Sequence, residues 1–255
     1  MKKTIGSFLA IVALGSSASA ATYFENFDSG VLTQGESLNG TAILTGGALQ
    51  LSVDGGASGF GSFGVPAIAN SSLGWTATYD YTIFDSVGAN EPADGFSLNY
   101  GNAAITELGS AEEGMAGAAA VSDNVSFEVD TWMNLDTEQG VNIAEKVGGV
   151  DTNLAFTNGS ILSDGTTVSG TATMVFDPVA GLSFTTTGLL TNAGFANVAT
   201  TFTGSDAYTF VLSSRVGGAN QTVTIDNLRI TTIPEPSGVA LIGLAGVGML
   251  LRRRR

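Results

Sequence analysis

The sequence contains neither cysteine nor histidine. Without cysteine, no disulfide can cross-link the chain, so the stability of the fold has to come from a hydrophobic core. Without histidine, Ser-His-Asp hydrolysis, Cys-His proteolysis and His-ligated zinc sites are excluded, because each of them needs an imidazole near neutral pH. The two absences together remove several large classes of enzyme.

Basic residues are also scarce. Between Ala21 and Ile233 there are three of them, Lys146, Arg215 and Arg229, against 22 acidic residues, so this region carries a net charge of −19. Such a surface repels phosphate backbones, which argues against a nucleic-acid partner. The charge is compatible with divalent cations and neutral sugars, although solubility alone would account for it equally well.

The first twenty residues have the layout of a secretory signal peptide. Lys2 and Lys3 form a positive start, an apolar stretch covers Ile5–Leu14, and small residues end the segment at Ala20. The apolar stretch is too short to span a membrane. We therefore expect residues 1–20 to form a signal helix that is removed on export.

The other end of the chain carries a second targeting pattern. Pro234-Glu235-Pro236 ends the strand pattern, because proline cannot continue the pairing. The apolar segment Gly238–Leu251 follows, and its fourteen residues would span roughly 21 Å as a helix, short of a hydrocarbon core of about 30 Å. Arg252–Arg255 close the chain.

This order of three parts resembles the PEP-CTERM sorting signal of Gram-negative envelope proteins. The resemblance implies that residues 233–255 are a sorting tail, recognised and removed by an exosortase-type membrane enzyme. Before removal, the hydrophobic helix would contact the inner membrane transiently, with the arginines on the cytoplasmic side. The processed protein would then reside in the periplasm, in the outer envelope or outside the cell.

Between the two ends, short runs of alternating apolar and polar residues are separated by turn residues such as Asp54-Gly55-Gly56. The clearest run places Trp75, Ala77, Tyr79, Tyr81 and Ile83 on one face of an extended segment. Further strands are expected at Thr171–Phe176, Leu182–Thr187 and Val223–Ile230. Because no long helical period appears, residues 21–232 are predicted to form one all-β domain, a sandwich or a barrel.

Two acidic residues share one face of a predicted strand. Side chains alternate along a strand, so Ser126, Glu128, Asp130 and Trp132 point the same way. Adjacent carboxylates repel one another unless a cation, a basic residue or water lies between them. No Lys or Arg occurs within ten residues on either side. A hard cation is the simplest explanation, with oxygens from Asp130, from the Trp132 carbonyl and from Asn134.

Two stretches resemble those of the concanavalin-A-like, L-type lectin superfamily: Ala93-Asp94-Gly95, and the Glu-x-Asp-Thr-Trp-x-Asn run from Glu128 to Asn134. The resemblance implies a two-sheet antiparallel jelly-roll sandwich, with the last strand, Val223–Ile230, close to the segment Thr22–Phe27. It also implies a carbohydrate site at Asp94, Gly95, Gly114 and Asn134, and a calcium site at Glu128, Asp130, Trp132, Asn134 and Asp136.

The chain departs from the lectin pattern in two ways. The family's transition-metal site uses a histidine, so that half of the metal site is expected to be absent. The last acidic calcium ligand does not align cleanly, and Asp136 and Glu138 are both candidates for it. A plainer interpretation also stays open: Asp94-Gly95 is an ordinary turn, and Glu128 and Asp130 are solvated on an exposed face.

The same fold also hosts retaining β-glucanases, whose nucleophile and acid/base lie on one strand as Glu-x-Asp-x-x-Glu. In this chain Met133 stands where the acid/base should be. A thioether cannot protonate a leaving group, and retaining hydrolysis needs two carboxyl groups. We therefore expect a glycan-binding protein without enzymatic activity. A structural protein of the extracellular or biofilm matrix is the alternative.

Overall fold

The structure is a computed structural model that describes residues 19–55, 58–85, 92–109, 121–132 and 139–234. Most of the expected signal peptide and sorting tail lies outside these ranges, as do Gly114, Met133, Asn134, Asp136 and Glu138. Within the described ranges, no helix is both long enough and apolar enough to cross a membrane.

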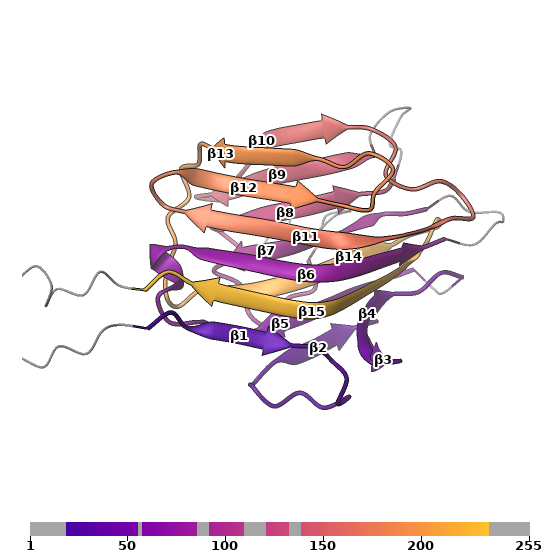
Figure 1. The fold of residues 1–255 in the computed structure, drawn as a ribbon, viewed down its shortest axis with the longest axis horizontal. Coiled ribbons are helices and arrows are strands. Elements are labelled where there is room, and N and C mark those ends of the chain that lie inside the picture. Colours follow the sequence, from indigo (N-terminus) through magenta and orange to yellow (C-terminus); the bar gives the residue numbers. More distant parts are fainter. Residues whose placement is uncertain (1–18, 56–57, 86–91, 110–120, 133–138, 235–255) are drawn as a thin grey trace, which may run out of the picture.

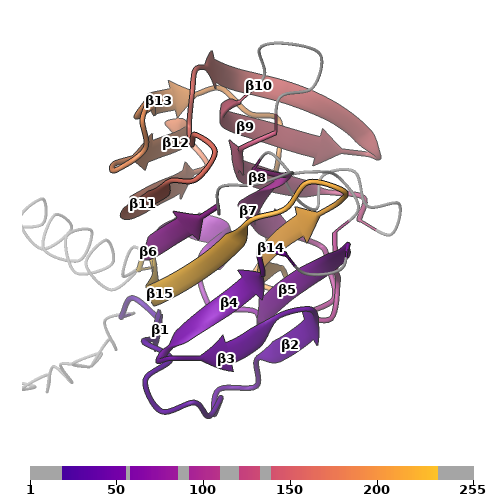
Figure 2. The ribbon, with the colours of Figure 1, turned by 90° about the vertical axis from the view of Figure 1, so that its right-hand side faces the viewer.

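Two antiparallel sheets pack face to face (Figures 1 and 2). The eight-stranded sheet contains β1 (Thr22–Glu25), β3 (Ile43–Thr45), β4 (Ala48–Ser52), β6 (Trp75–Phe84), β11 (Thr167–Asp177), β12 (Gly181–Thr186), β13 (Gly194–Val198) and β15 (Thr222–Thr232). The seven-stranded sheet contains β2 (Ser37–Gly40), β5 (Gly59–Val65), β7 (Gly95–Gly101), β8 (Asn124–Asp130), β9 (Gly140–Val147), β10 (Val150–Asn158) and β14 (Thr209–Val216). The helical structure in the described part of the chain is one 3₁₀ turn, Ser71–Leu73. The predicted all-β, two-sheet sandwich is confirmed.

The strand order runs β13-β12-β11-β6-β15-β4-β3 in the larger sheet and β10-β9-β8-β7-β14-β5-β2 in the smaller one. β1 pairs with β15, with Thr22 opposite Thr231. Beyond this pairing, the Thr232 amide donates to the Ala21 carbonyl at 2.9 Å. The expected contact between the first and last strands is therefore confirmed, and both ends of the sandwich leave it at the same place (Figure 1).

A cluster of aromatic rings between the sheets forms the centre of the core. Trp75 on β6 is fully buried and lies 5.4 Å from Tyr100, 5.8 Å from Phe127 and 5.0 Å from Phe210, measured between ring centroids. These three partners belong to β7, β8 and β14 of the opposite sheet. Each such pair contributes about 0.5–1.5 kcal/mol beyond the burial of its area. The cluster therefore joins the two layers directly.

A buried carboxylate fixes the connection between β13 and β14. Glu145 on β9 is 5% exposed. It accepts hydrogen bonds from the Thr200 hydroxyl at 2.5 Å, from the Thr201 hydroxyl at 2.8 Å and from the Phe202 amide at 3.3 Å. Each of these donors belongs to the segment that leads from β13 to β14. The connection is thereby held against the seven-stranded sheet.

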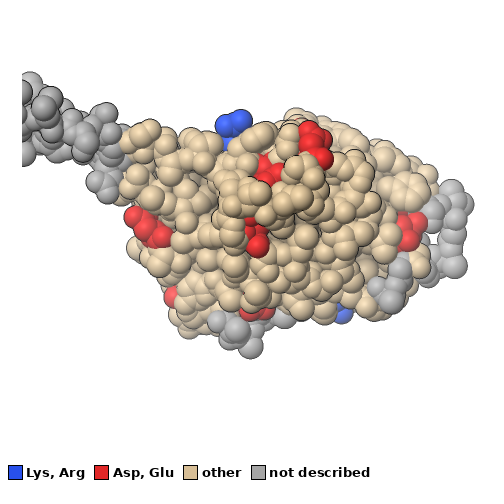
Figure 3. Space-filling model, turned by 90° about the horizontal axis from the view of Figure 1, so that it is seen from below, with Lys and Arg blue, Asp and Glu red and all other residues tan. Residues whose placement is uncertain are grey.

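The surface of the sandwich carries few charges. In the view from below, acidic side chains are scattered over a surface made mostly of uncharged residues (Figure 3). Of the three basic residues in the described part of the chain, Lys146 is buried and only Arg215 and Arg229 reach the surface. No basic patch of the kind that binds a phosphate backbone is formed by the described residues.

The tyrosines predict how stability depends on pH. Burial raises the pKa of Tyr23, Tyr79, Tyr81, Tyr100 and Tyr208, and for Tyr100 it does so to about 12. An unfolded tyrosine ionises at about pH 10, so the stabilisation is complete below that pH and is lost as the pH rises through the folded values. We expect unfolding between about pH 10 and 12. Tyrosinate absorbance and circular dichroism should change together, whereas titration near pH 10 with unchanged dichroism would contradict the burial.

Candidate functional site

Asp94 lies in a segment that is hydrogen-bonded on both sides. The peptide bond between Ala93 and Asp94 is cis. The Asp94 amide donates to the Arg215 carbonyl at 3.0 Å, and the Asp94 carbonyl accepts from the Thr131 amide at 3.1 Å. The segment therefore bridges the end of β14 and the residue that follows β8. The interpretation of Asp94-Gly95 as an ordinary turn is wrong, because Gly95 already begins β7.

The Asp94 side chain points toward the loop that follows β14. Its Oδ2 lies 3.5 Å from Nε of Arg215, and the Asp94 side chain is 10% exposed. The Arg215 guanidinium is itself held over the Phe60 ring, 5.3 Å from the centroid. A Cβ at Gly217 would stand 3.6 Å from Asp94 Oδ2. One carboxylate is thus fixed between an arginine and a glycine loop, at one end of the central strands β7 and β14 of the seven-stranded sheet.

The loop after β14 is anchored to the connection between β4 and β5. The Ser58 hydroxyl donates to the Gly217 carbonyl at 2.8 Å, and the Gly55 amide donates to Asn220 Oδ1 at 2.6 Å. The sequence alone assigned no role to Arg215. Only the fold shows that Arg215 meets Asp94, because the two residues are far apart in the sequence.

The β8 carboxylates are not solvated. Glu128 and Asp130 are 4% and 6% exposed. Glu128 Oε2 accepts from the Asn142 amide at 2.6 Å, and Asp130 Oδ1 accepts from the Trp132 amide at 2.9 Å. The interpretation of these carboxylates as exposed residues is therefore wrong. A second correction concerns Trp132: β8 ends at Asp130, so Trp132 lies beyond the strand and does not extend its face.

Asn142 is a candidate ligand that the sequence reasoning missed. It stands opposite Glu128 in the β8–β9 register. Its Oδ1 is buried and has no hydrogen-bond partner in the described part of the chain. Glu128, Asp130 and Asn142 therefore bring oxygen donors to one face, and an oxygen-only donor set suits calcium. Asn142 could have been identified only from the register between β8 and β9, which cannot be read from the sequence.

The described residues account for part of the predicted metal site only. No three acidic side chains among them are grouped closely enough to hold a metal ion. Asn134 and Asp136, which the sequence also assigned to the calcium site, lie outside the described residues, as does Gly114 of the expected carbohydrate site. Asp94, Gly95, Glu128, Asp130 and Trp132 do gather where β7 begins and β8 ends, since Gly95 pairs with Asp130.

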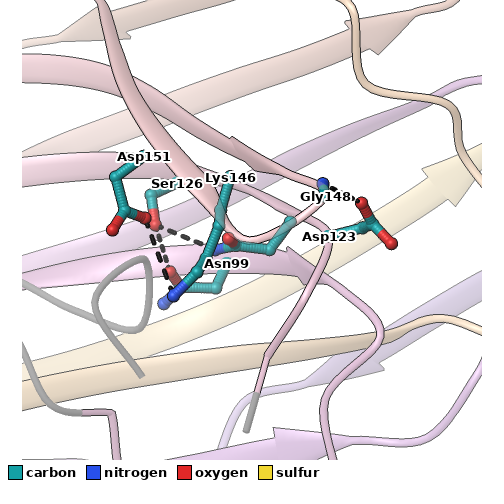
Figure 4. Close-up of polar contacts among 7 residues, drawn as sticks. Asn99, Asp123, Ser126, Lys146, Gly148 and Asp151 are labelled. Carbon is teal, nitrogen blue, oxygen red and sulfur yellow. Dashed lines mark hydrogen bonds and ion pairs between the residues drawn. The ribbon is translucent and has the colours of Figure 1, made fainter. Parts of the chain in front are cut away.

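The face of the seven-stranded sheet that points away from the core is polar and largely buried (Figure 4). Ser126 donates to Asn99, and the Asn99 amide donates to the Val211 carbonyl at 3.1 Å. Lys146 lies in the same group, 7% exposed, and its Nζ is 3.8 Å from Asp151. Satisfied networks of this kind hold side chains in one arrangement. The strands that carry the candidate site therefore have ordered contacts on both faces.

The antiparallel sandwich of one seven-stranded and one eight-stranded sheet is similar in fold to the legume lectins. Comparison with solved structures identifies the same fold. The chain is similar to the basic winged bean lectin with Tn antigen, with a TM-score of 0.64, 14% identity, and coverage of 86% of this chain and 100% of the lectin.

Two further structures show the same similarity. Peanut lectin with a nine-residue peptide gives a TM-score of 0.60 at 17% identity, covering 84% of this chain and 97% of the lectin. The exoplasmic/lumenal domain of VIP36, with bound Ca²⁺ and Man3GlcNAc, gives 0.58 at 15% identity, covering 78% and 86%. No family model and no curated protein sequence matches the chain. At these identities the similarity establishes the fold.

Gly95 provides a test of the site's geometry. Its φ of +148° is in a region that side chains rarely adopt, and a Cβ there would stand 2.4 Å from the Val129 carbonyl oxygen. We expect Gly95→Ala to destabilise the protein by about 2 kcal/mol or more, measured by denaturant unfolding. Gly218→Ala is the matched control, since a Cβ at Gly218 would meet nothing within 4 Å. Equal stability of the two variants would contradict this geometry.

Proposed function

We propose that this protein is an exported, lectin-like module that binds glycans at Asp94, with calcium supporting the site. The observation that carries the proposal is the fixed Asp94 carboxylate. Its backbone is hydrogen-bonded on both sides, and its side chain is paired with Arg215 beside the Gly217 loop. A binding group that is already ordered loses little entropy when a ligand arrives.

The chemistry of the site suits sugar hydroxyls. A carboxylate accepts hydrogen bonds from hydroxyl groups, and charged acceptors make stronger bonds than neutral ones. Gly217 and Gly218 carry no side chains, so a sugar ring can approach the carboxylate closely. The solved structures with this fold include lectins bound to Tn antigen and to Man3GlcNAc, and their likeness in fold supports a carbohydrate as the ligand class.

Calcium is proposed on the oxygens of Glu128, Asp130 and Asn142, with the predicted ligands Asn134, Asp136 and the Trp132 carbonyl completing the set. Bound calcium would supply positive charge to the carboxylates and hold the chain that follows β8 in place. That chain reaches the sugar site directly, because the Thr131 amide donates to the Asp94 carbonyl. The VIP36 domain, which has the same fold, was solved with Ca²⁺.

We propose no enzymatic activity for this site. Glu128 is buried and is hydrogen-bonded to Asn142. Met133 occupies the position where the glucanase pattern has its second glutamate. The glucanase pattern therefore supplies no second carboxyl group that could act as the acid/base. The structural matrix protein remains the alternative, and the binding experiment below separates it from a lectin.

Glycan binding is tested on an array. On a glycan array, the full chain should bind a defined set of sugars in the presence of calcium, and free sugar should compete. Asp94→Asn should reduce this binding by about tenfold or more, because a charged hydrogen bond contributes about 1.5–3 kcal/mol. Asp94→Asn should leave calcium binding unchanged. Asp151→Asn is the matched control, an aspartate that also pairs with a basic residue but is 56% exposed.

Calcium binding is tested separately by calorimetry and thermal unfolding. A ligand present at a hundred times its Kd stabilises the folded state by about 2.7 kcal/mol, so calcium should raise the Tm of the wild type. Asp130→Asn and Asn142→Leu should weaken calcium and glycan binding together. If calcium gives no heat of binding and no change in Tm, and no glycan binds, the lectin proposal fails. The structural matrix protein is then the better proposal.

Export is proposed from the two terminal patterns and has its own test. The mature protein should begin at or near Ala21 and end near Pro234–Pro236. Mass spectrometry of the intact protein from the cell envelope measures both ends at once. A mature species that still carries Arg252–Arg255 would contradict exosortase-type sorting, and a species that keeps Lys2 and Lys3 would contradict the signal peptide.

A further inference from the structure

A second cavity lies on the other side of the Asp94 segment, where β8 ends and β9 begins. It has a volume of about 220 Å³. Its floor is formed by the buried residues Pro92, Thr131, Gln139 and Leu162, and its rim by the exposed residues Ser160, Ser163 and Asp164. The rim residues belong to the connection between β10 and β11, which passes from one sheet to the other. Thr131 touches the proposed glycan site through its backbone amide, which donates to the Asp94 carbonyl, but its side chain has no role there.

The floor of this end cavity is held in place by one side chain. Gln139 is 7% exposed. Its Nε2 donates to the Thr131 carbonyl at 2.8 Å, and its Oε1 accepts from the amides of Ile161 and Leu162 at 2.7 and 3.2 Å. The amide thereby clamps the end of β8 to the β10–β11 connection. The cavity is a built feature whose walls do not need a ligand to form.

One polar group in the floor lacks a partner. Thr131 is fully buried, and its Oγ1 makes no hydrogen bond within the described part of the chain. Burying a hydroxyl without a hydrogen-bond partner lowers the stability of the folded state. A valine at this position would have nearly the same shape and would avoid that cost. A ligand in the cavity would satisfy this hydroxyl.

The charge around the cavity restricts the ligand. Asp164 stands on the rim, no described basic residue lines the cavity, and the buried Asp85 lies close enough to Asp164 for the two carboxyl groups to interact. Burial, and then the negative charges of Asp54 and Asp164, raise the pKa of Asp85, while a hydrogen bond from the Gly165 amide opposes the rise. A pocket with this potential repels anions.

The size of the cavity restricts the ligand further. Its volume corresponds to about seven water molecules at roughly 30 Å³ each, which is far too large for one bare cation. Hydroxyls on the floor and rim, with Pro92 and Leu162 between them, match a ring that carries several hydroxyl groups and an apolar C–H face.

We propose that the end cavity is a second sugar site, which holds one neutral or amino-substituted pyranose by means of the Thr131 hydroxyl and the polar rim. This inference goes beyond the proposed function and does not require Asp94 or calcium to bind anything. The two sites share a wall, because the backbone bond from Thr131 to Asp94 joins them. A glycan chain could then be held at two neighbouring positions.

The test is titration of the full chain, without calcium, with three probes: methyl β-glucoside, methyl β-glucosaminide and methyl β-glucuronide. Ligand-observed NMR measures the Kd of each. The first two should bind and the glucuronide should not. Thr131→Val should weaken binding by about three- to tenfold, the value of one neutral hydrogen bond, and should leave the Tm equal or raise it. A purely structural role for Thr131 would lower the Tm and leave the Kd unchanged.

Asp94→Asn separates this site from the proposed glycan site, because the part of probe binding that Thr131→Val removes should persist in Asp94→Asn. Asp164→Asn should improve glucuronide binding by relieving the repulsion at the rim. The proposal is overturned if neither neutral nor amino probe binds the wild type, or if Thr131→Val binds them as the wild type does. Loss of probe binding in Asp94→Asn would also overturn it. If the end cavity binds the probes but the full chain binds no glycan on the array, only the proposed function at Asp94 is contradicted.

Discussion

The packing of aromatic rings around Trp75 is the interaction on which the rest of the structure depends. The chain has no disulfide, so the two sheets are held together by what is buried between them. Trp75 contacts rings on β7, β8 and β14, and the ends of these three strands carry Gly95, Asp130 and Arg215. A loss of sheet packing would therefore move the whole candidate site, although no site residue belongs to the core.

The candidate sites also depend on hydrogen bonds between segments that are far apart in the sequence. Asp94 bridges Arg215 and Thr131 through its backbone, and Gln139 ties Thr131 to the β10–β11 connection. These contacts make one continuous structure from the Gly217 loop to the end cavity. Because these backbone groups are paired internally, the walls of the two sites are held in place without a ligand.

Much of the fold was predictable from local patterns. The alternation from Trp75 to Ile83 predicts β6 and its buried face, and the polar and glycine-rich turns predict the all-β class. The Ala93-Asp94-Gly95 motif falls on a segment whose backbone is hydrogen-bonded on both sides, and its role in sugar binding stays a prediction. The placement of Trp132 on the strand face and the supposed solvation of Glu128 and Asp130 were wrong. A period-two pattern reports neither where a strand ends nor what covers its other face. Asn142 and Arg215 were beyond reach, since cross-strand register decides their neighbours.

What the sequence by itself determined is the type of each segment, the shortage of positive charge, and the chemistry that the absence of histidine and cysteine excludes. These are local or additive properties, so they do not require knowledge of neighbours in space. Only the tertiary structure decided that Arg215 faces Asp94, that Asn142 lies beside Glu128, and that Thr131 is buried in the floor of a cavity. Such contacts arise from sheet order and register, which are set by the packing of the whole core and not by any single segment.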